Sequence, residues 1–404
     1  MAYIPRKRPG LSYKDRLVAD MGHRDWKGAL PVARGKDYFY VPDELLLSEG
    51  ALDLFRGELE RIGGKPDEEI NERFQKQGMD VRRWILAGQN IPRVVSRLRA
   101  LADDKPGVTV SPNAVLRGEP AYWGGPGGEP YLAADPGLSA SEAEYETPNI
   151  AVLDTGIWRG YKGQALLSNC VALDASDYDE LDVDGNVGLD TEAGHGTFIS
   201  GLIAQVAPGL LIDPGKVLDP TGVGSDVSIA LELFETEASV INLSLGCYTD
   251  NNQPPPALDQ ALSRLWPDRV VVAAAGNNAS DRPFWPAALK HVIAVGALDT
   301  TDPKRVRRAC FSDFGPWVDV WAPGVGLVST YVDGRWVTSD QDVTFQGWAS
   351  WMGTSFAAPL VAAEIARRAG GGSARNAAME TLADLPNEPG FGLVCNPSAN
   401  LVIT

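Results

Sequence analysis

The sequence predicts an α/β protein with a mostly parallel sheet, preceded by a small α+β domain. From Pro148 onward, short β-branched runs alternate with windows of helical periodicity. This alternation is typical of a parallel sheet covered by helices on both faces. Upstream, a shorter strand–helix–strand–helix–strand pattern ends at about residue 117. Ten of the 20 residues from Gly118 to Gly137 are then Gly or Pro, which separates the two parts.

These observations divide the chain into four segments: a polar, solvated tail over 1–36, an α+β domain over 37–117, a linker or arm over 118–147, and the main domain over 148–404. In the α+β domain we expect strands over 37–47, 81–88, 108–110 and 114–116. A first helix is indicated by apolar residues at helical spacing from Leu52 to Ile62, and a second by Asn90 as an N-cap before Pro92.

The main domain has one expected strand or helix for each apolar window. The strands are 149–153, 239–243, 269–274 and 291–295, and the helices are 195–205, 226–238, 256–265 and 354–369. Asp213-Pro214-Gly215 breaks a ladder of hydrogen bonds and therefore predicts an edge or a bulge in the strand that contains it.

Composition excludes several classes of protein. The 404 residues carry a net charge of −17, which argues against binding of nucleic acid through its phosphates. Since no run of about 18 apolar residues and no apolar signal region is visible, we expect a cytoplasmic protein without a membrane segment. The four cysteines form no CxxC pair, so free thiols are expected rather than a metal or redox site.

The negative charge is concentrated in the main domain. Residues 1–140 hold 21 Lys and Arg against 20 Asp and Glu, whereas the remaining residues hold 15 against 33. The two parts are therefore chemically different, and we expect substrates of the main domain to be basic or at least not acidic.

Four polar residues stand where the functional groups of a parallel sheet gather, at strand ends and helix starts. Asp154 ends the strand at 149–153, and His195, between two glycines, opens a helix. Asn277 follows the strand at 269–274, and Ser355 begins the last long helix.

Each of these residues has a simpler structural role when taken alone. Asp154 and Asn277 are typical turn or cap residues, and a serine at a helix start is usually an N-cap. The Asp154-Thr155-Gly156 tripeptide is also found in aspartic proteases, but their chemistry needs a second carboxylate, and the chain has one such tripeptide.

The four residues follow one another in the order Asp, His, Asn, Ser. With this order and the motifs around it, the chain resembles the subtilisin-like serine proteases, the subtilases. The resemblance lies in AVLDTGI around Asp154, GHGTFISGLIAQVAP around His195, SVINLSLG at 239–246, AAAGNN around Asn277 and GTSFAAPLVAA around Ser355. It covers about residues 148–404 and implies a subtilisin-like three-layer fold and a serine endopeptidase.

The resemblance implies a role for each residue of this set. Ser355 would be the nucleophile, His195 the general base, and Asp154 the residue that orients the imidazole; Asn277 would donate to the oxyanion. It also implies substrate-binding residues in three segments: Gly222, Val223 and Gly224 as a strand edge, and Ser244, Leu245, Gly246 and Ala274, Ala275, Gly276 as opposite walls of a specificity pocket. Cys247 follows the first wall, where we expect it to meet thiol reagents.

No cofactor is needed for this chemistry. Residues 174–190 carry seven carboxylates, and the metal ligands are left unassigned: a structural Ca²⁺ and a solvated acidic loop both stay open.

By the same resemblance, 37–117 is similar to the pro-domain of the secreted subtilases, and we expect the N-terminal region to restrain or mature the enzyme by reaching its cleft. The partners would be protein or peptide substrates, with no nucleic acid and no membrane. The alternative function is a catalytically silent binding protein with the subtilase fold.

Overall fold

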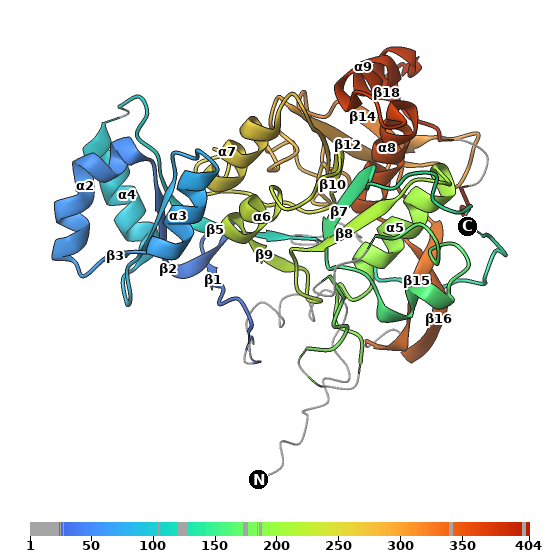
Figure 1. Ribbon diagram of the computed structural model, residues 1–404, viewed down its shortest axis with the longest axis horizontal. Helices are drawn as coiled ribbons and strands as arrows, with labels where there is room; N and C mark the ends of the chain where they lie inside the picture. Colours follow the sequence, from blue (N-terminus) through green and yellow to red (C-terminus); the bar gives the residue numbers. More distant parts are fainter. Residues whose placement is uncertain are drawn as a thin grey trace, which may run out of the picture.

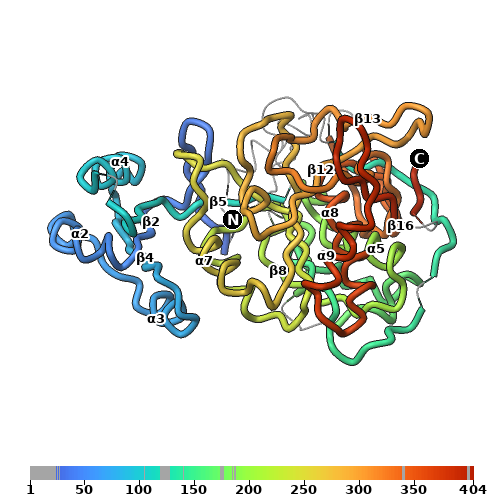
Figure 2. The backbone as a smooth tube through the Cα atoms, turned by 90° about the horizontal axis from the view of Figure 1, so that it is seen from above, coloured from blue at the N-terminus to red at the C-terminus, as the bar shows by residue number. Residues whose placement is uncertain are grey.

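The computed structural model describes residues 24, 26, 28–103, 105–118, 128–139, 141–172, 177–183, 185, 188–338, 342–397 and 401–404. It forms a large body and a smaller N-terminal lobe beside it (Figures 1 and 2).

A parallel sheet forms the centre of the large body. Its order is β17-β18-β14-β12-β11-β10-β7-β8, with β13 paired to β12. Every neighbouring pair from β18 to β8 is parallel, and only β13 and β17 run antiparallel to their neighbours. The bounds are β7 Ile150–Asp154, β8 Ile212–Lys216, β10 Val240–Leu243, β11 Val270–Ala274, β12 Val292–Asp299, β13 Arg307–Arg308, β14 Val320–Pro323, β17 Asn387–Glu388 and β18 Gly392–Val394.

Helices cover both faces of this sheet. Along β7, Ile150 and Val152 join the cluster on the side of α5 (His195–Val206), α8 (Thr354–Ala369) and α9 (Ala374–Asp384). Ala151 and Leu153 point to the other side, toward α6 (Asp226–Glu232) and α7 (Pro256–Leu265). Because both faces are buried, the strands are continuous apolar runs. The prediction of a three-layer α/β fold is confirmed.

The N-terminal lobe is an antiparallel sheet with helices. Its strands are β1 Ala33–Arg34, β2 Phe39–Leu47, β3 Lys65–Pro66, β4 Arg82–Ile85 and β5 Val110–Arg117, and its helices are α2 Glu49–Arg61, α3 Glu68–Lys76 and α4 Ile91–Ala102. The helices α2 and α4 share an apolar cluster with β2 and β4, separate from the clusters of the large body. Asn90 caps α4, as its sequence predicts, by accepting from the Arg93 N–H at 3.0 Å.

The lobe is joined to the large body through β5. This strand pairs antiparallel with β9 (Val223–Ser225), so the sheet of the lobe continues into the large body. Behind it, Leu46 and Phe74 of the lobe pack with Leu258 and Leu262 of α7 in one apolar cluster. The Gln260 amide also donates to the carbonyl oxygen of Asp80 at 2.9 Å.

A hairpin flanks the start of α5. Its strands β15 (Leu327–Val337) and β16 (Asp342–Trp351) pair antiparallel, and the short β6 (Tyr131–Leu132) adds to β16. The anchor of β6 is buried: the indole N–H of Trp336 and the hydroxyl of Thr338 donate to Glu129 Oε2 at 3.1 and 3.0 Å. The chain is therefore held to the large body from residue 128 onward.

The structure differs from the predicted elements in several places, and β9, β14, β18 and α9 are among the elements without a counterpart in the prediction. The strands at 108–110 and 114–116 are one strand, β5, and α3 and the hairpin of β15 and β16 were not expected. The helix expected over 226–238 ends at Glu232, because Thr236 binds Asp213 and Ala238 in a local turn. Asp213-Pro214-Gly215 does lie in an edge strand, β8, as predicted.

The described part of the tail over 1–36 is also not simply solvated. β1 lies within it, and Leu30 and Val32 pack against an apolar cluster of Val41, Val115 and Val223. The guanidinium of Arg24, whose side chain is 4% exposed, pairs with Asp219 and donates to Thr221 Oγ1 at 2.8 Å. Burial of a charged group requires such partners.

Candidate active site

Asp154 and His195 lie at the centre of the candidate site and are fully buried. Asp154 is the last residue of β7, and Oδ1 of its carboxylate is 2.8 Å from Nδ1 of His195. The same oxygen accepts from the N–H of Thr155 at 2.8 Å, which orients the carboxylate. A carboxylate held on Nδ1 leaves the other ring nitrogen, Nε2, for proton transfer. The single D-T-G is thus part of a carboxylate–histidine pair and not of a carboxylate pair.

The glycines on both sides of His195 allow this close approach. A Cβ on Gly196 would lie 2.3 Å from the carbonyl oxygen of Gly156, which belongs to the turn after β7. Gly194 has a φ of +81°, and a Cβ there would lie 2.7 Å from the ring of Tyr331. A side chain at 196 would push α5 away from the turn after β7 and separate the pair, and one at 194 would push the start of α5 away from β15.

Asp179, a residue of the acidic loop, binds the residues next to both members of the pair, Thr155 and Gly194. It is buried, and its Oδ2 accepts from the N–H of Gly194 at 2.7 Å and from the hydroxyl of Thr155 at 3.0 Å. The Thr155 hydroxyl in turn accepts from the N–H of Gly196 at 3.2 Å. Burial raises the pKa of Asp179 to about 6, because desolvation disfavours the charged carboxylate.

Ser355 lies at the start of α8 and is 1% exposed. It is not an N-cap, because the N-cap of α8 is Gly353 and no side chain caps the helix. Its hydroxyl instead donates to the carbonyl oxygen of Gly118 at 3.1 Å and lies 3.4 Å from that of Ser244. The Ser244 hydroxyl donates to the Ser355 carbonyl oxygen at 2.6 Å, which ties α8 to the segment after β10.

Asn277 lies against the start of the same helix. Its Oδ1 accepts from the backbone N–H and from the hydroxyl of Thr354, both at 2.9 Å. The Thr354 hydroxyl also accepts from the N–H of Gly276 at 3.1 Å. Since the amide group is planar, these bonds fix its orientation and turn its NH₂ away from Thr354. The four candidate residues of the sequence therefore belong to adjoining strand ends and helix starts, as expected.

The residues expected to bind substrate are occupied by the end of β5. Arg117 pairs with Gly246 through two backbone hydrogen bonds of 2.9 Å, and the N–H of Gly118 donates to the carbonyl oxygen of Gly222 at 3.1 Å. Val223 and Gly224 pair with Arg117 and Leu116. Two of the three predicted segments, 222–224 and 244–246, thus hold a strand of the chain itself at the hydroxyl of Ser355.

The third predicted segment, 274–276, is packed more tightly than a specificity pocket requires. Ala274 and Ala275 are buried, and the N–H of Ala275 donates to the carbonyl oxygen of Val295 at 2.9 Å. A Cβ on Gly276 would lie 2.5 Å from Asp313 Oδ2. The position of this segment next to Asn277 and Thr354 is as expected; its contact with substrate stays a prediction.

Glu192 is a site residue that no sequence motif indicates. It is fully buried, and its Oε2 is 3.9 Å from Nε2 of His195. Its backbone is fixed at both ends, because its N–H donates to the Pro220 carbonyl oxygen at 2.8 Å and its carbonyl oxygen accepts from the His195 N–H at 3.0 Å. The spacing of three residues before His195 was the one available signal for it.

The acidic loop offers little to a cation among the residues that the structure describes. The Asp179 oxygens accept protein N–H and O–H groups, and Glu180 pairs with Lys216 at 2.9 Å. Asp174, Asp184 and Asn186 lie outside the described residues. Over the described residues there is no group of three or more His, Cys, Asp or Glu placed to hold a metal ion. The described carboxylates therefore do not fit a calcium site.

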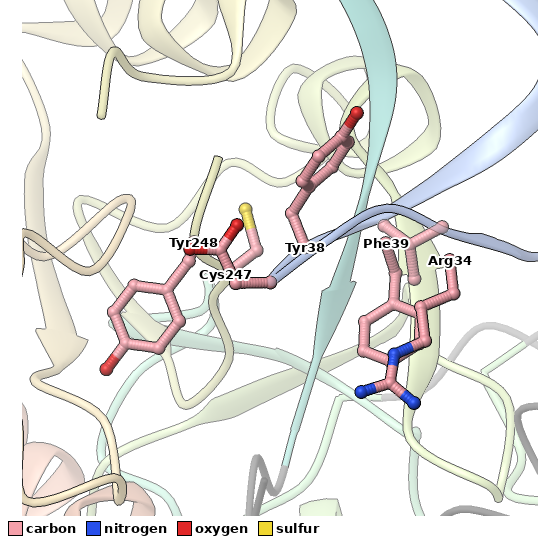
Figure 3. A pocket seen from close by; sticks show the side chains of 7 residues that line it. Arg34, Tyr38, Phe39, Cys247 and Tyr248 are labelled. Carbon is pink, nitrogen blue, oxygen red and sulfur yellow. The ribbon is translucent and has the colours of Figure 1, made fainter. Parts of the chain in front are cut away.

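A small pocket lies where the N-terminal lobe meets the segment after β10. Figure 3 shows Arg34, Tyr38 and Phe39 of the lobe together with Cys247 and Tyr248; Asp37 and Val115 complete the lining. Cys247 is buried here, and burial raises the pKa of its thiol. Ready reaction of Cys247 with thiol reagents is therefore not expected in this form, because the thiolate is the reactive species. Of the cysteines, only Cys310 is exposed, and all four are free thiols.

Within the described part of the chain, none of the helices combines the length and the apolar character that a membrane span requires.

Comparison with known proteins gives one family. The family model described as "Subtilase family" matches residues 146–375, more than half of the chain. A thermophilic serine proteinase of Bacillus sp. (strain AK1) is 37% identical over 235 residues, which are 53% of this chain and 50% of that protein. Thermitase of Thermoactinomyces vulgaris is 35% identical over 260 residues, 60% of this chain and 83% of thermitase.

The solved structures agree at the level of the fold. Fervidolysin from Fervidobacterium pennivorans, a keratinolytic enzyme related to subtilisin, has a TM-score of 0.54 and 22% sequence identity. The match covers 84% of this chain and 56% of fervidolysin. The chain thus spans about half the length of two of the proteins that it matches.

Proposed function

The chain belongs to the subtilase family of serine proteases, and on this basis we propose that it is a serine endopeptidase that hydrolyses peptide bonds through an acyl-enzyme on Ser355. The observation that carries the proposal is the 2.8 Å contact between Asp154 and His195, together with an extended strand at the Ser355 hydroxyl. This strand lies between residues 222–224 and 244–246, which we call the groove.

In the proposed mechanism, Ser355 Oγ attacks the carbonyl carbon of the scissile bond and gives its proton to Nε2 of His195. Asp154 holds Nδ1–H and stabilises the imidazolium that forms. His195 then returns the proton to the leaving amine, and water repeats the sequence in reverse to release the acid product. In the form described here, the Ser355 hydroxyl donates to Gly118 instead, so the strand must leave before the hydroxyl engages His195.

Asn277 and the backbone N–H of Ser355 are the proposed donors to the oxyanion. The two bonds from Thr354 to Asn277 Oδ1 support this role, because they hold the amide in place before charge develops. Preorganised donors of this kind contribute about 3 kcal/mol each to the stabilisation of a transition state.

The substrate would be a protein or peptide bound as an added strand. Residues 222–224 and 246 already form such a ladder with 115–118, and an external peptide would use the same N–H and C=O groups. Pairing of this kind recognises the backbone of an extended chain and is therefore compatible with many sequences.

We further propose that the N-terminal region restrains the enzyme by occupying this groove. Three features support the restraint: the pairing of β5 with β9, the hydrogen bond from Ser355 to Gly118, and the contact of Arg24 with Asp219 and Thr221 in the turn that precedes β9. The expectation that residues of the arm over 118–147 occupy the cleft is supported at Gly118; residues 119–127 lie outside the described residues. The segment boundaries at 36, 117 and 147 also stay proposals.

A fluorophosphonate probe tests the function. We expect it to modify Ser355 slowly in the intact chain and faster after limited proteolysis of the N-terminal region. A Ser355→Ala variant is the control and should remain unlabelled. If neither the intact nor the trimmed protein is labelled, the alternative of a catalytically silent binding protein would replace the proposal.

Two finer predictions accompany the proposal. Calcium dependence is open only through the part of the acidic loop outside the described residues, and activity in excess EDTA measures it. The cytoplasmic location is likewise a prediction, which fractionation of the source cells tests.

A further inference from the structure

Position 118 of the strand in the groove is a glycine, and its surroundings are specific. A Cβ at this position would lie 3.2 Å from Cδ1 of Leu218 and 3.5 Å from Oε2 of Glu192, with Nδ1 of His195 at 3.6 Å. The Leu218 contact is with the end of a flexible side chain, which can move by a few tenths of an ångström. A side chain at this position of the strand would thus point toward one buried carboxylate.

Glu192 is not free to turn away from this position. Both ends of its backbone are hydrogen-bonded, to Pro220 and to His195. Its methylene groups lie under Gly222, where a Cβ would be 2.3 Å from the Glu192 Cγ. A glycine at 222, with a φ of +77°, is what leaves room for the Glu192 side chain. The Glu192 carboxylate is therefore held in place by Gly222, whose carbonyl oxygen accepts from the N–H of Gly118.

The distance from the Cβ to the carboxylate fits one kind of side chain well. In a hydroxyl donor the oxygen is one bond from Cβ, and an O–H···O bond has an O···O distance of about 2.8 Å, so Cβ lies roughly 3.5 Å from the acceptor when the angle is tetrahedral. That is the distance found here. Alanine would fill the space without bonding, and aspartate would place a second charge against Glu192.

We propose that Glu192 is a specificity-determining residue that selects serine or threonine at the substrate position held by Gly118 and rejects acidic side chains there. The hydroxyl donates to the buried Glu192 Oε2, beside His195. The chain's own strand carries glycine at this position and therefore lacks the bond that a matching substrate would make.

This inference rests on the proposed endopeptidase function for its biological meaning, but the contact between a side chain at position 118 and Glu192 can be tested without catalysis. All variants are made in full-length Ser355→Ala protein, which cannot cleave itself. We expect Gly118→Ser to unfold about 2–4 °C above Gly118→Ala, the shift that one more buried hydrogen bond gives in a domain of this size. In Glu192→Met, which keeps the length of the side chain without the carboxylate, this difference should vanish. Equal midpoints for serine and alanine, or a difference that persists with methionine at 192, would overturn the proposal.

The selectivity itself is measured on quenched peptides that carry the sequence of residues 114–117 followed by Ser, Ala or Asp and a common second half. For the N-terminally trimmed protease without substitutions we expect kcat/KM for serine to exceed that for alanine about tenfold, as for a hydrogen bond to a charged acceptor, and aspartate to be the slowest. The ratio of serine to alanine should approach one in Glu192→Met, whatever its absolute rate. A ratio near one in the unsubstituted protein would contradict the selectivity. Failure to cleave any peptide, with the coupling at position 118 intact, would instead count against the endopeptidase function.

Discussion

Two sets of contacts, one within the active site and one at the junction with the N-terminal lobe, differ in kind. Within the protease body, Asp154, His195 and Asp179 are buried and linked by hydrogen bonds of 2.7–3.2 Å. Between the body and the N-terminal lobe, the polar contacts include ion pairs with partly exposed side chains, such as Arg99–Asp250 at 2.6 Å and Arg282–Asp37 at 2.5 Å. The first set fixes the positions of Asp154 and His195, whereas the second joins the N-terminal lobe to the protease body.

The energetics of the two sets differ accordingly. A buried hydrogen bond to a charged group is worth about 1.5–3 kcal/mol, and its loss leaves a partner in an apolar setting. An exposed ion pair contributes about 0–1 kcal/mol and is screened by salt. Under the proposed restraint, we therefore expect the lobe to leave without disturbing the pair of Asp154 and His195, although the apolar packing and the pairing of β5 with β9 must break as well. The following predictions test that separation.

The largest effect is expected at the nucleophile. Ser355→Ala should lower kcat/KM of N-terminally trimmed protein by at least about 10⁴-fold, because the covalent step is lost. Peptide hydrolysis with a fluorogenic substrate measures it. Ser263→Ala, on an exposed position of α7 in the large body, is the matched control and should leave the rate unchanged. Residual activity within tenfold of the unsubstituted enzyme would exclude Ser355 as the nucleophile.

The second effect concerns the apolar part of the junction. Leu116 of β5 is fully buried in the cluster shared with the large body, so Leu116→Asp should detach the strand from the groove. We expect Cys247, now covered by the lobe, to react with a maleimide at least about tenfold faster, since its burial decreases. Cys310, which is exposed in the intact chain, is the internal control and should keep its rate. Unchanged labelling of Cys247 would show that the lobe does not protect it.

The third effect concerns Asp179, which binds the neighbours of Asp154 and His195. Asp179→Asn keeps the shape but replaces one carboxylate oxygen by an NH₂ group, so the side chain can no longer accept from Leu181 on one oxygen and from Gly194 and Thr155 on the other. We expect kcat to fall about tenfold or more with little change in KM, because the position of His195 is altered and the groove is not. A fall in KM alone, with kcat retained, would contradict a positioning role.

Asp179 also predicts a dependence of stability on pH. Its pKa in the folded protein is raised to about 6 from an ordinary value of 3.8, so between these values the folded state binds more protons than the unfolded one. The contribution of this group to the free energy of unfolding is therefore greatest below pH 4 and decreases as the pH rises toward 6. Unfolding midpoints of Asp179→Asn, measured from pH 4 to 7, should decrease less than those of the parent, because Asp226 and Asp313, whose pKa values burial raises to about 7 and about 6, contribute equally in both proteins. An identical profile in the variant and the parent would rule out the assignment.

The smallest effect is expected at the exposed pairs. Asp37→Asn and Arg99→Gln should each raise the rate of Cys247 labelling by no more than about fivefold, and 0.5 M salt should remove most of the difference. Lys65→Gln, on the part of the lobe away from the junction, serves as the control. A larger effect that is insensitive to salt would mean that these pairs belong to the first set of contacts and not to the second.

The sequence was sufficient for the parts of the fold that repeat a local pattern. The strands of the parallel sheet are buried on both faces and so appear as short apolar runs, as at Val270–Ala274. By contrast, α3 buries only Asn71 and Phe74, which is too little for a visible apolar stripe. The first six residues of β15 are all buried and show no alternation, and its pairing depends on contacts with α5 that no local window contains.

The site divides in the same way. His195, Asn277 and Ser355 stand beside glycines at element ends, and this local signal, together with their order, identified them. Glu192 and Asp179 carry no such signal, because a carboxylate in an acidic stretch usually faces solvent. The proposed role of Glu192 depends on its contact with the Gly118 position, and that of Asp179 on the N–H of Gly194. Such partners are set by the tertiary structure alone.

The strand at Ser355 is attached to the body at both ends. Gly118 contacts the hydroxyl of Ser355, and the Trp351 indole N–H donates to the carbonyl oxygen of Gly128 at 2.5 Å, ten residues further along the chain. Under the proposed restraint, a substrate competes with an intramolecular strand whose effective concentration is on the order of millimolar. One cut between the two anchors would convert this into ordinary bimolecular competition. Dilution alone would then activate the enzyme, and the timing of activity would depend on how far the severed lobe can diffuse away.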